Sequence, residues 1–437
     1  MPSDSADYLG KLPGLAPQTS VDRPVTASEY YHASVGTSRY TLESSRYVFF
    51  VLHGSCVDAL DEQELTQKLT QAIAQVSACN PVLRMRWHGN LGHSRWLSDG
   101  PLPRFRVVSE CQWDGQSSAG ADILDAPGLS LRDGPCAEFI WASQGQGRGL
   151  LILRSHHAVM DGLGGMHLLS ELFRALRGEP LLGSNAAFSD ADLMRAMAIT
   201  STKHEPYDTC TLTGAPAGDD VGDDWWRVRF GPVQPRLLSK VALALTEFAH
   251  QFSDAPVRIA IPVDLRKHVP GMLASANFAN MLFVRLNKGA QATDFDGQLR
   301  EQLAARREGA YPAIYDWLRW LPLRWFDYLL GRRLANFTTR KPVETVLISN
   351  MGKVDLTAFQ SSIFKADDYT VSPMPGNAFV VLYSIGDEIS MMISLPRILS
   401  SNGRKQALVA WLKQRFGEAN GDESSSGGCN ESNACKS

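Results

Sequence analysis

Several features that would assign this chain to a simple class are missing from its sequence. It has no run of roughly 18 apolar residues, so no transmembrane helix is expected. It has no basic excess, because 43 basic and 46 acidic side chains give a formal charge of −3, and this offers no case for nucleic acid. The first residues, MPSDSADYLGKLPGL, lack the basic and apolar regions of a secretory signal. We therefore expect a cytoplasmic protein.

The cysteines do not resemble a disulfide framework or a zinc site. There are seven, an odd number, and they are scattered without CxxC spacing. We expect reduced cysteines that act as small apolar residues. Two of them, Cys429 and Cys435, lie in the polar stretch GDESSSGGCNESNACKS, which is predicted to be disordered.

The length of 437 residues and the hydrophobic content of 44% suit two domains of ordinary size, or one large domain. The acidic, glycine-rich stretch TGAPAGDDVGDD, residues 213–224, is the best linker candidate. Strands and helices are mixed on both sides of it, with hairpins in place of regular βαβ alternation. The pattern predicts two α+β units of similar size, and neither a Rossmann sheet nor a barrel.

Hydrophobic periodicity places the main elements. The first is a buried strand at 46–54, followed by a helix that starts with a capping box at Asp61 and ends before Asn80-Pro81. The further predicted elements are strands at 82–87, 257–263, 281–286 and 343–349, hairpins at 136–155 and 378–395, and helices near 169–176, 235–251, 296–307 and 408–416.

The stretch SHHAVMDG, residues 155–162, carries the most chemical information. It follows a predicted strand at 150–154 and precedes a helix, a place where functional groups often collect. Histidine is the side chain best suited to accept and return a proton near neutral pH. An aspartate four residues later can fold back on the turn, and the glycines allow a ligand to approach the backbone.

Three interpretations of this motif are open on physical grounds. Two adjacent histidines point to opposite faces of a strand, so at most one of them faces a given cleft. His157 and Asp161 could bind a metal, but an obvious third ligand is lacking. Both histidines could be structural, with satisfied hydrogen bonds. The third interpretation, which we favour, is that one histidine is a general base.

HHAVMDG resembles the HHxxxDG signature of nonribosomal-peptide condensation domains and of the wider thioester-dependent acyltransferase superfamily, which includes chloramphenicol acetyltransferase. Other segments resemble parts of that superfamily in the same order, over roughly residues 25–415: NPVLRMRW at 80–87, IPVDLRKH and SANFANMLFVRL within 261–286, and LISNMGKVDL at 347–356. The chain departs from the pattern at 26–36, where TASEYYHASVG replaces a glutamine-x-arginine signature. It also has Ala276-Asn277 in place of glycine-asparagine, with Asn280 as the competing match.

The resemblance implies an α+β fold of two chloramphenicol-acetyltransferase-like subdomains in a V-shaped pseudodimer, with the active-site tunnel between them. The expected division is an irregular arm at 1–24, an N-terminal subdomain at 25–212 that carries HHxxxDG, a linker at 213–224, a C-terminal subdomain at 225–417 and a disordered tail at 418–437.

The resemblance also implies a function. His157 would act as the general base while an alcohol or amine attacks an acyl thioester, forming an ester or amide without an acyl-enzyme and without a metal. The thioester would be carried on the phosphopantetheine of CoA or of a carrier protein, with no other cofactor. The implied setting is specialised-metabolite biosynthesis, such as that of nonribosomal peptides, polyketides and antibiotics.

Further site residues follow from the same resemblance. His156, Asp161 and Arg266 are expected to be structural, with Arg266 the favoured partner of Asp161, because a buried aspartate needs a cation or donors. The candidates for the oxyanion site and the tunnel wall are the Gly162 backbone amide, Asn277, Ser349 and Asn350.

The segment WLRWLPLRWFDYLLGRRL, residues 317–334, is not explained by the resemblance. We expect an amphipathic helical pair, interrupted at Pro322 and packed on the second half of the chain. A contact with a membrane surface or with an acyl or carrier group is the alternative. Two rival functions also stay open: a lipid or wax-ester acyltransferase that uses long-chain acyl-CoA, and a silent platform that binds a carrier protein. The intact His157 and Asp161 count against the silent platform.

Overall fold

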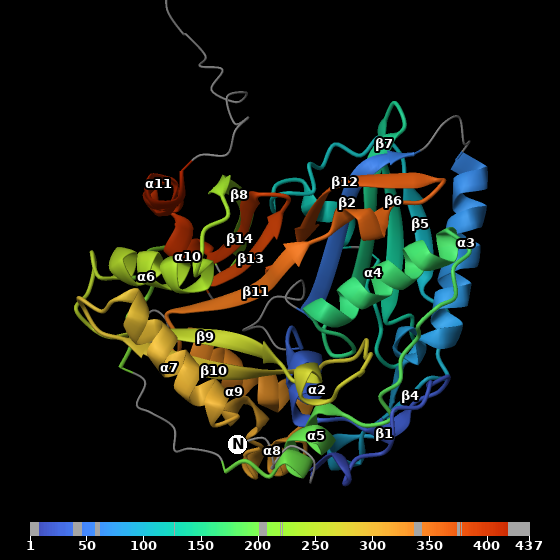
Figure 1. Cartoon of the computed structure of the whole chain (residues 1–437), viewed down its shortest axis with the longest axis horizontal. Coiled ribbons are helices and arrows are strands. Elements are labelled where there is room, and N and C mark those ends of the chain that lie inside the picture. The colour runs from blue at the N-terminus through green and yellow to red at the C-terminus, as the bar shows by residue number, and fades with distance from the viewer. Residues whose placement is uncertain are drawn as a thin grey trace, which may run out of the picture.

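The computed structural model describes residues 8–37, 46–56, 62–125, 127–200, 208–218, 220, 222–335, 343–373, 376 and 378–417, and every structural statement below refers to these residues. The predicted capping residue Asp61, the cysteines Cys429 and Cys435, and the predicted tail at 418–437 lie outside them. The fold is mixed α+β, as the sequence pattern predicts (Figure 1).

A five-stranded sheet in the order β12-β2-β7-β6-β5 forms the first half. Its centre is antiparallel, and the predicted hairpin at 136–155 is β6 and β7. Its apolar strands are buried on both faces, and α4 packs against both α3 and β2. The elements are β2 (Tyr47–Cys56), α3 (Glu62–Cys79), β5 (Arg104–Val108), β6 (Ala137–Gly145), β7 (Arg148–His156), α4 (Gly162–Leu176) and β12 (Phe364–Val371).

A six-stranded sheet in the order β10-β9-β11-β13-β14-β8 forms the second half. Strand β11 runs parallel to both of its neighbours, and the register shifts between Asn350 and Gly352. The elements are β8 (Asp223–Pro232), α6 (Leu237–Ala249), β9 (Val257–Asp264), β10 (Ala279–Leu286), α7 (Ala292–Ala304), β11 (Val346–Val354), β13 (Phe379–Ile385), β14 (Glu388–Pro396), α10 (Arg397–Ser400) and α11 (Arg404–Phe416).

Strand β12 joins the two halves. It follows β11 in sequence, yet it pairs along its length with β2 at the edge of the first sheet (Figure 1). The hydroxyl of Tyr383 in β13 donates to the carbonyl of Tyr369 in β12 at 2.9 Å, and both rings are buried. We propose two subdomains that meet near residues 213–224, with β12 crossing from the second to the first.

Smaller elements lie at the edge of this frame. A three-stranded sheet of β1 (Asp22–Pro24), β4 (Arg95–Leu97) and β3 (Arg86–His88) is joined by α2 (Ala27–Ser34), α5 (Asp190–Met197), α8 (Ile314–Leu318) and α9 (Leu323–Ala335). The predicted strand at 82–87 is mostly wrong, since Pro81–Arg84 forms a 3₁₀ turn. Proline at the first position of a helical turn has the required φ, and the alternation of residues 82–87 fits such a short turn as well.

The segment at 317–334 does form a helical pair, α8 and α9, interrupted at Pro322. Its packing differs from the prediction, because both helices lie against α2 of the first half. The hydroxyl of Tyr30 donates to the carbonyl of Leu321 at 2.5 Å, and Phe326 packs edge-on against Tyr30. In the described residues, no helix has the length and apolar character needed to cross a bilayer.

Candidate active site

The HHxxxDG motif spans the end of β7 and the start of α4. Asp161 is the N-cap of α4, and its Oδ1 accepts from the Gly164 amide at 2.8 Å. A Cβ on Gly164 would lie 2.2 Å from the carbonyl oxygen of Ser275, and a Cβ on Gly165 would lie 2.1 Å from the Phe50 ring. These two glycines are therefore needed for close packing of α4, not for approach of a ligand.

An ion pair connects Asp161 in the first half to Arg266 in the second. The guanidinium of Arg266 donates to Oδ1 at 2.9 Å and to Oδ2 at 3.2 Å, and the two side chains are only 11% and 9% exposed. The amide of Phe278 also donates to Oδ2, at 2.8 Å. Burial disfavours the charge on Arg266, but Asp161 and Asp264 outweigh it and raise the pKa of Arg266. The predicted pairing of Asp161 with Arg266 is present in the structure.

His157 is held by its backbone and by one ring nitrogen. Its Nδ1 lies 3.0 Å from the carbonyl of Met160, which can only accept, so the neutral ring donates from Nδ1 and keeps a lone pair on Nε2. Its own carbonyl accepts from Nδ2 of Asn277 at 2.8 Å. Burial lowers the pKa of His157, while the Met160 carbonyl and the Asp161 charge partly oppose that shift. The ring is therefore neutral near pH 7.

His156 points the other way, as adjacent residues at the end of a strand should. It is buried against Tyr47, and its Nδ1 accepts from the amide of Ala158 at 3.2 Å. Burial lowers the pKa of His156 well below its ordinary value. This ring is part of the core.

His32, which no motif in the sequence marks as a site residue, lies on α2 and stacks on His157. The ring centroids are 3.9 Å apart and the planes differ by 18°. Burial lowers the pKa of His32 well below its ordinary value, and the neighbouring histidines lower it further. The site therefore holds two stacked neutral imidazoles. The only signal in the sequence was the capping box Thr26-x-x-Glu29, which predicts the helix but not its neighbour.

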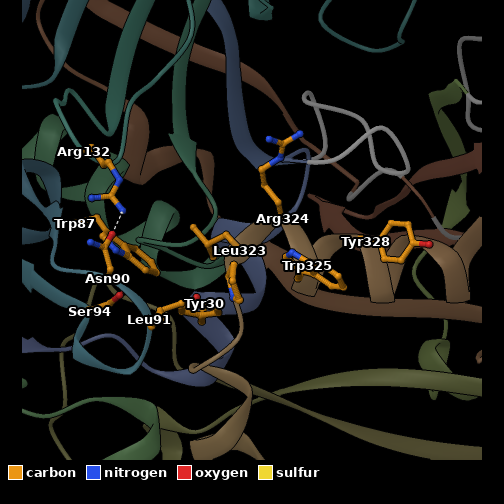
Figure 2. Close-up of a pocket in the computed structure, with 11 residues that line it drawn as sticks. Tyr30, Trp87, Asn90, Leu91, Ser94, Arg132, Leu323, Arg324, Trp325 and Tyr328 are labelled. Atoms are coloured by element: carbon orange, nitrogen blue, oxygen red, sulfur yellow. Dashed lines mark hydrogen bonds between the residues drawn. The ribbon is translucent and has the colours of Figure 1, made fainter.

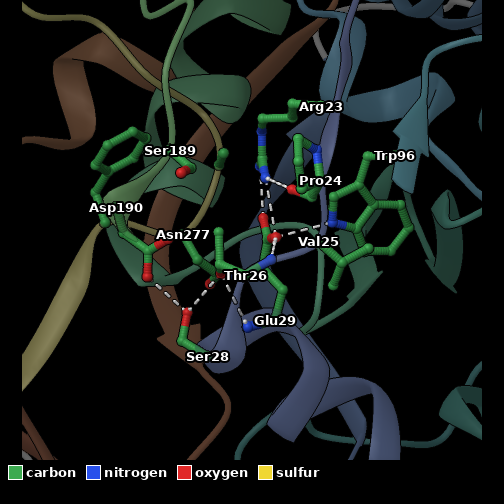
Figure 3. A network of polar contacts seen from close by, with 12 residues as sticks. Arg23, Pro24, Val25, Thr26, Ser28, Glu29, Trp96, Ser189, Asp190 and Asn277 are labelled. Carbon is green, nitrogen blue, oxygen red and sulfur yellow. Dashed lines mark hydrogen bonds and ion pairs between the residues drawn. The ribbon is translucent and has the colours of Figure 1, made fainter. Parts of the chain in front are cut away.

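A buried polar network fixes the start of α2 (Figure 3). The Glu29 carboxylate accepts from Arg23, from the Trp96 indole at 2.9 Å and from the Thr26 amide at 2.8 Å. The preceding residue, Ser28, donates to the carboxylate of Asp190 at 2.7 Å. Burial raises the pKa of the Asp190 carboxyl to about 6. These contacts tie α2 to β1, β4 and α5, and so fix the position of His32.

A cavity of about 190 Å³ lies between the two halves at these residues. Residues from both halves line it, among them Ser28, His32, His157, Gly162, Asn277, Ser349 and Asn350. The competing match Asn280 lies elsewhere, because its amide donates to the Glu308 carbonyl at 2.6 Å. The oxyanion and tunnel candidates expected from the sequence are thus brought together at one place.

These candidates differ in whether their polar atoms already make hydrogen bonds within the protein. Asn277 already donates to the His157 carbonyl, and Oδ1 of Asn350 accepts from the Gly352 amide at 3.1 Å. Gly162 is the first residue of α4, where amide groups have no partner within the helix and the helix dipole favours negative charge. Its amide therefore has no partner within the helix, and Gly162 lines the cavity. In the part of the chain that the structure describes, no cluster of three or more metal-ligating His, Cys, Asp or Glu side chains is present.

No known family model matches the sequence, and no curated protein does. Solved structures match nearly the whole chain. The condensation domain of the monacolin K polyketide synthase MokA has a TM-score of 0.62 at 12% identity, over 91% of this chain and 98% of that one. The chain has a condensation-domain fold. The arrangement of two acetyltransferase-like halves expected from the sequence agrees with this match.

Two further structures with this fold were solved with ligands. The starter condensation domain of the rhizomide synthetase RzmA, in complex with C8-CoA and Leu-SNAC, has a TM-score of 0.60 at 13% identity, over 92% of this chain and 95% of that one. TRI101 of F. sporotrichioides, complexed with coenzyme A and T-2, has a TM-score of 0.59 at 15% identity, over 90% and 98%. At these identities the similarity establishes the fold, and the function has to be argued from the site.

The first prediction concerns the Asp161–Arg266 ion pair. Breaking a buried pair from one side typically costs roughly 3 to 5 kcal/mol, so Asp161→Asn and Arg266→Met should each lower the free energy of unfolding by about that amount. The double variant should lose clearly less than the sum, because neither charge is then left without its partner. Urea unfolding of the four proteins measures this. Additive losses would mean that the two side chains do not stabilise each other.

The second prediction concerns pH and the stacked histidines. When folding lowers the pKa of a histidine, its contribution to the free energy of unfolding is complete above the unfolded pKa of about 6.5. That contribution is lost as the pH falls from there through the folded pKa. His32→Phe keeps a stacked ring that cannot be protonated. The variant should therefore lose less free energy of unfolding than the wild type between pH 7.5 and 5.5, by up to about 1.4 kcal/mol per pH unit below 6.5. Urea unfolding at pH 7.5 and 5.5 measures the loss in each protein. Equal losses in the wild type and the variant would contradict a buried, neutral His32.

Proposed function

We propose that this chain is an acyltransferase that moves an acyl group from a thioester of CoA or a carrier protein to an alcohol or amine. The observation that carries the proposal is the state of His157. Its ring is fixed through Nδ1 at the cavity between the halves, and burial lowers its pKa, so the ring is neutral near pH 7. A neutral imidazole in that state can accept a proton at Nε2 and return it.

The reaction follows from that geometry. The acceptor's oxygen or nitrogen attacks the thioester carbonyl carbon while its proton passes to Nε2 of His157. The carbonyl electrons move to oxygen, giving a tetrahedral oxyanion. When that intermediate collapses, the carbon–sulfur bond breaks and the imidazolium returns the proton to the leaving thiolate. The products are an ester or amide and a free thiol, and the protein itself is not acylated.

We assign the oxyanion to the amide of Gly162. This amide lies in the first turn of α4 beside His157 and adds the positive end of the helix dipole to a hydrogen bond. We assign Asn277 to holding the His157 backbone, and Ser349 and Asn350 to the cavity wall. His156, Asp161 and Arg266 would be structural.

Two observations support CoA or a carrier arm as the donor. The RzmA domain was solved with C8-CoA and a leucine thioester, and TRI101 with coenzyme A and T-2. Both proteins have the fold of this chain. We therefore infer a phosphopantetheine-carried acyl donor and a small-molecule acceptor. That the reaction belongs to specialised metabolism, and that the protein is located in the cytoplasm, stay predictions.

The length of the acyl chain separates this proposal from a long-chain lipid acyltransferase. The cavity between the halves measures about 190 Å³. Higher kcat/KM with palmitoyl-CoA than with acetyl-CoA or octanoyl-CoA would favour the lipid function.

The third prediction tests the base. His157→Ala should lower thiol release from the acyl thioester about 10² to 10⁴-fold, since that is the usual contribution of a general base. His88→Ala is the control, because this half-exposed histidine contacts Asp99 outside the cavity. Circular dichroism of both variants checks the fold. Full activity of His157→Ala would contradict the assignment.

The fourth prediction tests the oxyanion donor by removing one hydrogen. Gly162 is the first residue of α4, a position that tolerates proline because its amide has no helical partner. Gly162→Pro removes the amide hydrogen, and kcat should fall about 10² to 10³-fold.

Gly162→Ala is the matched control for that prediction. It keeps the amide hydrogen but adds a similar Cβ, which would lie 3.1 Å from the Met351 sulfur. Similar rates for the alanine and proline variants would mean that Gly162 is not the oxyanion donor.

A further inference from the structure

A second cavity, of about 910 Å³, lies on the opposite face of α2 from the candidate active site. Ser28 and His32, four residues apart on one helical face, line the active-site cavity, whereas Tyr30 lines the second one. No residue lines both cavities. The larger one lies between the 87–94 segment and the start of α9, and its volume is within the range of small-molecule sites (Figure 2).

Most of the wall is apolar or aromatic. Trp87 packs against Tyr30 with ring centroids 5.5 Å apart, and Leu91 and Leu323 add aliphatic surface. Trp325 at the start of α9 is 64% exposed, although it is among the largest apolar side chains of the protein. An apolar ligand body placed here would cover that ring and remove its surface from water.

The charged side chains of the wall, Arg132 and Arg324, are both cations. Arg132 donates only to neutral oxygens, Oδ1 of Asn90 at 2.9 Å and the carbonyl of Gly89 at 3.4 Å (Figure 2). Arg324 on α9 has no hydrogen bond or ion pair with any described residue. None of the described residues that line the cavity is acidic. Two positive charges thus lie beside an apolar surface without a carboxylate.

Two further wall residues have a polar atom without a partner. Trp87 is 4% exposed and Ser94 is 2% exposed, yet the indole Nε1 and the hydroxyl Oγ make no hydrogen bond with any described residue. A buried donor without an acceptor typically costs about 1 to 3 kcal/mol. Neither atom is accessible to solvent, so a group in the cavity would reach them only after the wall moved.

We propose that this cavity binds an amphipathic organic anion, that is, a carboxylate or phosphate head on an aliphatic chain or ring. An arginine of the wall binds the head and the aromatic wall covers the apolar body. Such an anion could be a free acid or the head of an anionic lipid at a bilayer surface, where tryptophan and arginine side chains are commonly found. The site is separate from the thioester cavity, so it does not depend on the acyltransferase proposal.

The fifth prediction tests the site with sodium laurate as the probe. Titration followed by calorimetry should show saturable binding to the full chain. Arg132→Met and Arg324→Met each remove one positive charge at the cavity, and at least one of them should weaken binding about tenfold or more. Arg148→Met is the matched control, because this exposed arginine pairs with Asp367 outside the cavity and should leave binding unchanged.

A further arm separates the two sources of the anion. Vesicles of phosphatidylglycerol and of phosphatidylcholine separate the sources: retention on the anionic vesicles alone, lost in Arg324→Met, identifies a bilayer lipid, whereas laurate binding without retention identifies a free acid. The proposal is overturned by no binding in either arm, or by wild-type affinity for laurate in both arginine variants.

Discussion

The ion pair between Asp161 and Arg266 is the contact on which the candidate site depends. One carboxylate caps α4, pairs with Arg266 and accepts from the amide of Phe278, so it connects the first half of the chain to the second. His157 lies four residues before this carboxylate, on the same turn. The cavity between the halves therefore depends on the buried Asp161 carboxylate, whose hydrogen-bond partners come from both halves. Removing Arg266 would leave the buried Asp161 carboxylate without its cation, and removing Asp161 would leave Arg266 paired with Asp264 alone.

A second layer of contacts surrounds the catalytic candidate. Asn277 holds the backbone of His157 from the second half, and His32 covers the ring from α2. Because α2 is itself tied down through Glu29 and Asp190, the stacked imidazoles are held by groups far from the motif in sequence. Burial then keeps both rings neutral, which is the state that a general base needs before an acceptor arrives.

The sequence predicted the parts of this arrangement that are local or that follow from a pairing rule. The motif is contiguous, so the opposite orientations of His156 and His157 follow from the strand. A buried aspartate implies a cation, and the family resemblance pointed to Arg266. The stack with His32 could not be predicted, because it requires α2 to lie beside the end of β7. The pairing of β12 with β2, and the packing of α8 and α9 on α2, depend likewise on tertiary contacts between distant segments.

The central claim is direct acyl transfer, and one measurement tests it most directly. Wild-type protein is mixed with octanoyl-CoA, with and without a panel of small alcohols and amines. Free thiol, acylated acceptor and the intact mass of the protein are then followed together. The account predicts that thiol release requires an acceptor, equals the amount of acylated acceptor and leaves the protein mass unchanged. Thiol release without an acceptor, accompanied by a protein mass increased by one octanoyl group, would contradict it, as would the absence of any release.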